Sequence, residues 1–192
     1  MTSFTLGIAS SDTWLQCVLA NFDEFLIDHA ANERKASAMA MSLVAHYPDR
    51  RELVSSMIDL ALEELNHFRQ VIRLLQERGL VMIADEKDRY VNQMRSHIRK
   101  GPEEYFLDRL LSGALIEARG EERFRLISNS LKDVKLRTFY HTLANTEQGH
   151  HELFVRLARQ YFDQSAVDQR LGEWVAIEHT IINQLPVRSR LH

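Results

Sequence analysis

Residues 60–71 read LALEELNHFRQV, and this stretch brings an acid and an imidazole onto the buried face of a long predicted helix. Steps of three and four residues along that helix collect Leu53, Met57, Leu60, Glu64, His67, Val71 and Leu75. Glu64 and His67 form one Glu-x-x-His turn, so both side chains lie on the same helix face, among aliphatic residues. A charged group among core positions needs a compensating partner.

A second Glu-x-x-His turn occurs at Glu147 and His150, again on a predicted inner face. Each turn follows a further core-facing acid on the preceding helix: Glu33 stands 31 residues before Glu64, and Glu117 stands 30 residues before Glu147. One such turn alone is commonly a solvated pair or a local hydrogen bond. Two copies with matching spacing indicate an internal near-duplication with a shared purpose.

Metal binding explains why four acids and two imidazoles occupy core positions. Burying four carboxylates together without compensation would cost several kcal/mol each or raise their pKa values until they were neutral. Two divalent cations remove that cost, and this donor set suits iron or manganese, with iron as our first choice. The same donor set is typical of di-iron helical bundles. The predicted metal ligands are Glu33, Glu64, His67, Glu117, Glu147 and His150.

The rest of the chain fits an all-α fold. Gly (7) and Pro (3) are scarce in the 192 residues, so turns are few and the elements should be long. We predict four long helices at about 21–46, 49–78, 103–130 and 131–162, with shorter helices at 12–19 and 167–184. The connection 79–101 is long enough to cross a bundle and reads as helical over 86–99. The expectation is a ferritin-like four-helix bundle with a long crossover and flanking helices, as one domain over 1–192.

Composition narrows the cellular setting. No basic segment followed by an apolar run opens the chain, and no apolar stretch is long enough for a membrane helix, so we expect a soluble, cytoplasmic protein without a membrane partner. The single Cys17 excludes an internal disulfide framework and cysteine-based metal sites. A net charge of -3 gives no global attraction to nucleic acid.

Four segments resemble the bacterial tRNA-(2-methylthio-N6-isopentenyladenosine) hydroxylase family. They are HAANERKAS at 29–37, EELNHF at 63–68, YVNQMRSHIR in the crossover at 90–99 and EARGEERF at 117–124. The resemblance spans essentially the whole chain, and generic ferritins are not expected to share the crossover segment. It identifies the chain as similar to ferritin-like, non-haem di-iron monooxygenases.

The resemblance implies a specific activity that the residues alone do not name. The enzyme would hydroxylate the isopentenyl group of 2-methylthio-isopentenyladenosine beside the anticodon of tRNA, using two iron ions, dioxygen and an external ferredoxin- or reductase-type electron donor. Glu64 and Glu147 would bridge the metals, Glu33 and Glu117 would be the carboxylates from the other two helices, and His67 and His150 the terminal imidazoles. The di-iron centre itself would be catalytic, and no separate acid or base is assigned.

Several other residues carry weaker signals. Glu121, one turn beyond Glu117, is an alternative ligand, an acid that supports a ligand, or a partner for a neighbouring arginine. Glu63 and His151 adjoin proposed ligands and would replace them if the helix phase were different. His29, one turn before Glu33, is interpreted as a hydrogen-bonded core histidine near the site or as part of its entrance. Tyr140 is interpreted as a core tyrosine, with a redox role as the alternative. Arg95, Arg99 and Lys100 are the candidate tRNA contacts, because basic residues gather in the crossover. Further basic residues are His97, Lys132, Lys135, Arg137, Arg188 and Arg190.

Three other functions remain open on the residues alone. A ferroxidase or iron-storage protein would use the same ligands inside a hollow shell, and a manganese catalase or peroxide reductase would turn over peroxide. A helical RNA-binding or scaffold protein would need no metal at all. The oligomeric state, the need for the methylthio group, the hydroxylated carbon and the identity of the electron donor do not follow from the sequence.

Overall fold

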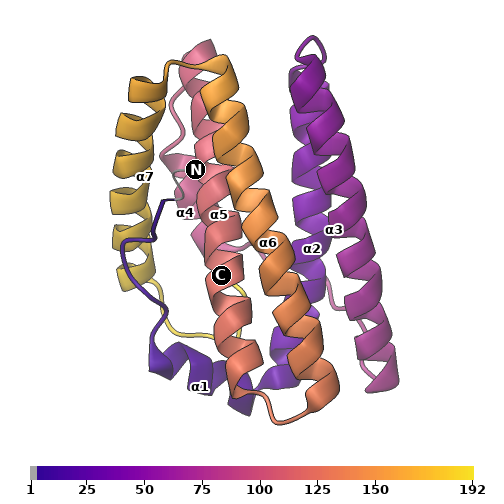
Figure 1. The fold of residues 1–192 in the computed structure, drawn as a ribbon. Coiled ribbons are helices and arrows are strands. Elements are labelled where there is room, and N and C mark those ends of the chain that lie inside the picture. The colour runs from indigo at the N-terminus through magenta and orange to yellow at the C-terminus, as the bar shows by residue number, and fades with distance from the viewer. Residues whose placement is uncertain (1–3) are drawn as a thin grey trace. The chain divides into compact units, whose positions relative to one another are not determined.

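The computed structural model describes residues 4–192, and over this range the chain is all-α (Figure 1). It contains seven helices and no strand there: α1 (Asp12–Ala20), α2 (Phe22–His46), α3 (Arg51–Glu77), α4 (Arg89–Ser96), α5 (Pro102–Ser130), α6 (Val134–Tyr161) and α7 (Gln164–Gln184). The all-helical prediction is therefore confirmed. No helix in the described range is long and apolar enough to cross a membrane.

The chain divides into two compact units. One contains residues up to Leu15, residues 87–187 and His192, and the other contains residues 16–86 and 188–191. The first unit carries α4 to α7, and the second carries α2 and α3. The expectation of a single domain over 1–192 stays a prediction.

In the second unit α2 packs against α3, and the connection between them is only four residues long. Ser37 Oγ on α2 donates a hydrogen bond of 2.8 Å to the carbonyl of Ala61 on α3, which helps to fix the register of the two helices. Gly79 ends α3 with a φ of 70°, a left-handed conformation that glycine adopts without steric cost. The amide of Leu80 then donates to the Leu75 carbonyl at 2.9 Å, which satisfies one of the last free carbonyls of the helix.

In the first unit α5 packs along α6, and α7 packs on α5. Pro102 occupies the first turn of α5, where its missing N–H costs nothing. Asp133 caps α6 by accepting a bond from the amide of Leu136 at 3.0 Å, and Asp163 caps α7 by accepting one from Ser165 at 2.9 Å. These caps correct two predicted boundaries: α6 begins at Val134 rather than 131, and α7 at Gln164 rather than 167.

The crossover is less helical than predicted, because α4 covers Arg89–Ser96 instead of 86–99. Asp88 starts this helix by accepting a hydrogen bond from the amide of Val91. Tyr90 and Met94 on α4 are buried, whereas the residues between Gly79 and Asp88 form no helix. The crossover is thus held by a short amphipathic helix rather than by a long one.

Asp108 on α5 holds the end of the crossover and α7 through charged hydrogen bonds. Its carboxylate is fully buried and accepts bonds from Arg99 Nη2 at 2.9 Å, Arg170 Nε at 2.7 Å and Trp174 Nε1 at 3.2 Å. Burial would raise the pKa of Asp108, but the bonds from Arg170 and Arg99 outweigh it and lower the pKa to about 2. The carboxylate is therefore ionised at neutral pH.

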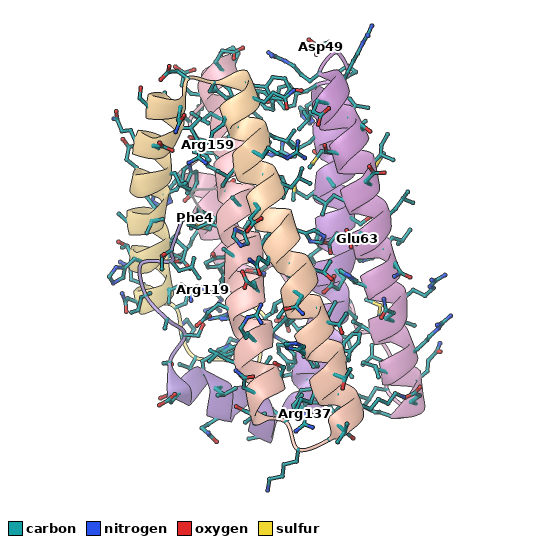
Figure 2. All side chains as sticks on the ribbon, in the orientation of Figure 1. Phe4, Asp49, Glu63, Arg119, Arg137 and Arg159 are labelled. Carbon is teal, nitrogen blue, oxygen red and sulfur yellow. The ribbon has the colours of Figure 1, made fainter. Side chains whose placement is uncertain are left out.

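A second buried polar cluster holds the N-terminal segment. Arg119 on α5 is fully buried (Figure 2 labels it); its Nε donates to Glu178 on α7 at 2.8 Å, and its Nη2 donates to the carbonyl of Ile8 at 2.9 Å. Arg123, one turn later, lies over the ring of Trp14 at 4.4 Å and donates to Ser10 Oγ. Each charge in this cluster has an opposite charge or a hydrogen-bond acceptor nearby, as buried charges require.

Candidate metal centre

Three of the predicted ligands meet in the second unit, on the facing sides of α2 and α3. Glu33 comes from α2, and Glu64 and His67 come from α3; all three side chains are buried. They can each offer one ligand atom such that the atoms lie within 4.8 Å of one another. His67 Nδ1 is 3.5 Å from Glu33 Oε2 and 3.9 Å from Glu64 Oε2. We call these three residues the Glu33 group.

The other three predicted ligands meet in the first unit, on α5 and α6. Glu117, Glu147 and His150 are buried, and their ligand atoms also approach within 4.8 Å of one another. His150 Nδ1 lies 3.0 Å from Glu147 Oε2. One turn before Glu117, a Cβ added to Gly113 would lie 3.1 Å from Phe154 on α6, so glycine allows the two helices to approach closely there. We call these residues the Glu117 group.

The electrostatics of the Glu33 group favour a bound cation. Burial alone would lower the pKa of His67, but the carboxylates of Glu33 and Glu64 raise it to about 10. Without metal, His67 therefore carries a proton that partly balances the acids. A metal ion bound at this imidazole nitrogen must displace the proton, and it brings more positive charge in return.

The donor chemistry of both groups fits a metal such as iron or manganese. Each group supplies two carboxylates and one imidazole, which are ligands for hard-to-borderline divalent metals. Buried acids at this density need positive charge nearby, and two divalent cations would supply it. Within each group the i, i+3 spacing of Glu and His sets both donors on one face of one helix, which explains why the local sequence positions them without help from distant residues.

The helix phase predicted from the spacing agrees with the structure at the neighbouring residues. Glu63 is exposed on α3 (Figure 2), while Glu64 beside it is buried. His151 is buried, but its Nε2 lies 3.1 Å from Glu121 Oε2 and its ring packs edge-on against Phe4. Neither Glu63 nor His151 belongs to the Glu33 or Glu117 group.

Glu121 is an ion-pair partner in this structure. Arg125 Nη2 donates to its Oε1 at 3.1 Å, and His151 contacts its other oxygen. Burial would raise the pKa of Glu121, but the bonds from His151 and Arg125 outweigh it and lower the pKa. Tyr140 lies in the core against Phe124 and Phe139, with ring centroids 5.6 and 5.1 Å away.

The predicted tRNA contacts differ in their surroundings. Arg95 and Lys100 are exposed, as a phosphate-binding residue must be. Arg99 is exposed in part, but its Nε and Nη2 both donate to Asp108, so this side chain has a structural role. Arg188 and Arg190 bond to Glu86 within the second unit.

His29 agrees with the first of its two predicted roles, a hydrogen-bonded core histidine near the site: its ring is buried, and its Nε2 lies 2.5 Å from Glu33 Oε1. Its position one turn before Glu33 is the sequence signal for this contact. Two other clusters have no such local signal. In the Asp108 cluster, Asp108 and Arg170 are 62 residues apart in the sequence, and in the Arg119 cluster, Arg119 and Glu178 are 59 residues apart. No local sequence pattern predicts such pairs.

The helices and the two ligand groups define the class of protein to which the chain belongs. The order of long helices, the crossover after α3 and the duplicated carboxylate and imidazole groups are those of a ferritin-like protein, as the sequence predicts. Residues 2–192 match the family described as tRNA-(MS[2]IO[6]A)-hydroxylase (MiaE). The chain belongs to this family, and the recognition made from its sequence segments is confirmed.

Two curated relatives support this family assignment, and one solved structure shares the fold. A tRNA 2-(methylsulfanyl)-N(6)-isopentenyladenosine(37) hydroxylase from Pseudomonas putida is 35% identical over 97% of this chain and 91% of its own length. A protein of the same name from Salmonella typhimurium is 35% identical over 69% of this chain and 48% of its length. The solved structure, "Protein 43 with aldehyde deformylating oxygenase activity from Synechococcus", aligns with a TM-score of 0.94 at 32% identity, covering 99% of this chain and 96% of that one.

Proposed function

We propose that this protein is a cytoplasmic tRNA hydroxylase that adds one oxygen atom to the isopentenyl group of 2-methylthio-isopentenyladenosine beside the anticodon. The observation that carries the proposal is the family match over residues 2–192, together with the activity for which two relatives at 35% identity are named. These relatives do not favour the three alternative functions, which are a ferroxidase or iron-storage protein, a manganese catalase or peroxide reductase, and a metal-free RNA-binding or scaffold protein.

The six predicted ligands would hold two iron ions. By the family resemblance, Glu64 and Glu147 would be the bridging carboxylates, Glu33 and Glu117 the carboxylates from the other two helices, and His67 and His150 the terminal imidazoles. This ligand set is supported by the burial and matched composition of the Glu33 and Glu117 groups.

When bound, a reduced iron pair supplies the activation of dioxygen that allows oxygen to enter an unactivated C–H bond. The protein's residues hold the ions, orient the prenyl group and exclude water. His67 must release its proton before it can serve as a ligand, and its pKa of about 10 in the metal-free protein sets the cost of that step. No separate acid or base is assigned, so the carboxylates and imidazoles of the two groups are the functional side chains.

The substrate and the electrons both come from partners. The anticodon loop is single-stranded, so the modified adenosine can leave its stack and enter a protein site. Arg95 and Lys100 in the crossover are the proposed phosphate contacts, and Arg99 contributes less because Asp108 engages its guanidinium. A ferredoxin- or reductase-type protein supplies electrons, because hydroxylation with dioxygen reduces the second oxygen atom to water.

The test is mass spectrometry of nucleosides after a reaction. Iron-loaded protein is incubated with dioxygen, a reductant and tRNA that carries 2-methylthio-isopentenyladenosine, and the digest is searched for a gain of one oxygen on that nucleoside. Glu64→Ala should abolish the gain. The matched control is Glu63→Gln, on the exposed side of the same helix turn, which should leave the gain unchanged.

A second arm uses an aldehyde, because the solved relative is named for aldehyde deformylating oxygenase activity. Oxygen gain on the nucleoside without aldehyde turnover supports the tRNA hydroxylase. Aldehyde turnover without nucleoside oxidation, at a confirmed content of two irons per chain, replaces the proposal by the activity of that relative. Rapid iron oxidation or peroxide consumption alone moves the function to ferroxidase or peroxide chemistry.

A further inference from the structure

His29 makes a short side-chain contact to Glu33, one of the proposed ligands of the Glu33 group. Its Nε2 lies 2.5 Å from Glu33 Oε1, and its ring is fully buried. The two residues are one helical turn apart on α2, so the helix itself brings them together. The ring of Phe25 stacks on His29 with centroids 5.9 Å apart and an interplanar angle of 29°, which restricts the imidazole orientation.

The two oxygens of Glu33 face different groups. Oε1 is hydrogen-bonded to His29, whereas Oε2 lies 3.5 Å from Nδ1 of His67, another proposed ligand. With Glu33 ionised, the imidazole Nε2–H donates to Oε1. Donation to Oε1 restricts the carboxylate rotamer and would leave Oε2 as the oxygen available to a metal ion. His29 would thereby hold Glu33 in one orientation for metal binding.

In the second half of the internal duplication, the position equivalent to His29 is occupied by glycine. The residue one turn before Glu117 is Gly113, and the space a side chain would need there is taken by Phe154, whose Cε1 lies 3.1 Å from an added Cβ. Glu117 therefore receives no hydrogen bond from position 113. The two groups have the same ligand types but differ in the residue that precedes the single glutamate.

We infer that His29 is a positioning residue that holds Glu33 for metal binding, and that it raises the affinity of one of the two metal positions without affecting the other. The inference rests on the proposed two-metal site and deepens it. Partners that orient metal ligands typically contribute 10- to 100-fold to metal affinity, and this sets the size of the expected effect.

The test measures stepwise metal affinity rather than turnover. Metal-free full-length protein is titrated with Co²⁺ under anaerobic conditions, followed by visible absorption and by competition with a chelator. Wild type should bind two ions. His29→Leu and His29→Asn, whose amide is too short to reach Glu33, should weaken one step by about 10- to 100-fold. His29→Gln should restore it to within a few-fold, because the longer amide can still donate. The control is His46→Gln, at the exposed end of α2.

A double variant separates positioning from a general structural effect. If His29 acts through Glu33, then His29→Asn added to Glu33→Gln should weaken binding little beyond Glu33→Gln alone. Circular dichroism of each metal-free variant identifies those that fold, and the Asn and Gln variants carry the test if the Leu variant does not. Equal loss in both binding steps, unchanged binding in His29→Asn, or full additivity in the double variant would overturn the inference. A wild type that binds fewer than two ions would instead overturn the proposed metal centre.

Discussion

Replacing Asp108 by Asn should destabilise the protein and remove an acid-sensitive part of its stability. Asp108 is fully buried and receives bonds from Arg99, Arg170 and Trp174. Its pKa is lowered from 3.8 to about 2, and this depression corresponds to about 2 kcal/mol of preference for the ionised form in the folded state. Asn mimics the neutral acid in size and charge, so we expect a loss of about 2 kcal/mol. For a chain of this length that loss lowers Tm by about 4–8 °C.

The sign of the pH dependence follows from the depressed pKa. Above the unfolded-state pKa near 3.8, Asp108 is ionised in both states and its full contribution is present. As the pH falls from about 4 towards 2, the unfolded chain takes up the proton first, so the free energy of unfolding decreases. In Asp108→Asn this component is absent, and the difference in stability between wild type and variant should shrink across that window.

Urea denaturation of the metal-free protein between pH 7 and pH 2.5 measures both quantities. Glu173→Gln is the matched control, because Glu173 also pairs with Arg170 but is exposed, and surface pairs contribute less than about 1 kcal/mol. The reasoning is refuted if Asp108→Asn unfolds like wild type at neutral pH, or if the stability difference between the two stays constant down to the lowest pH.

Three further substitutions test other parts of the molecule. Arg119→Met leaves the buried carboxylate of Glu178 without its cation and should cost about 3–5 kcal/mol, measured by thermal unfolding; a Tm near that of wild type would contradict the buried ion pair. Glu147→Gln should reduce metal content below two ions per chain by elemental analysis, whereas Gln148→Ala, on the exposed side of α6, should leave it unchanged; equal content in both would remove Glu147 from the ligand set. Lys100→Ala should weaken tRNA binding and reduce the slope of log affinity against log salt by about 0.7 to 0.9, measured by filter binding; an unchanged slope would place the phosphates elsewhere.

Local periodicity made much of the fold predictable. The spacing of apolar residues predicted each long helix, and it placed Glu64 inward and Glu63 outward, as the structure has them. The predicted starts of α6 and α7 were wrong by three residues each. A single capping side chain determines where each of these helices begins, Asp133 for α6 and Asp163 for α7. In the crossover, the predicted helix is longer than the observed one. Only Tyr90 and Met94 of α4 are buried, and a helix needs such packing to be stable.

By itself, the sequence determined the helical class, the buried faces of all six proposed ligands and the resemblance to the tRNA hydroxylase family, because helical spacing is a local property of the chain. The structure alone decided which charges meet. Asp108 with Arg170, Arg119 with Glu178 and Glu121 with His151 are pairs between different helices, and their contacts depend on how those helices pack. The contact of His29 with Glu33 is different, because both residues and the neighbouring Phe25 lie on α2 and their spacing is local. Spacing along one helix sets the face on which a side chain lies, and only packing sets the partner that it meets.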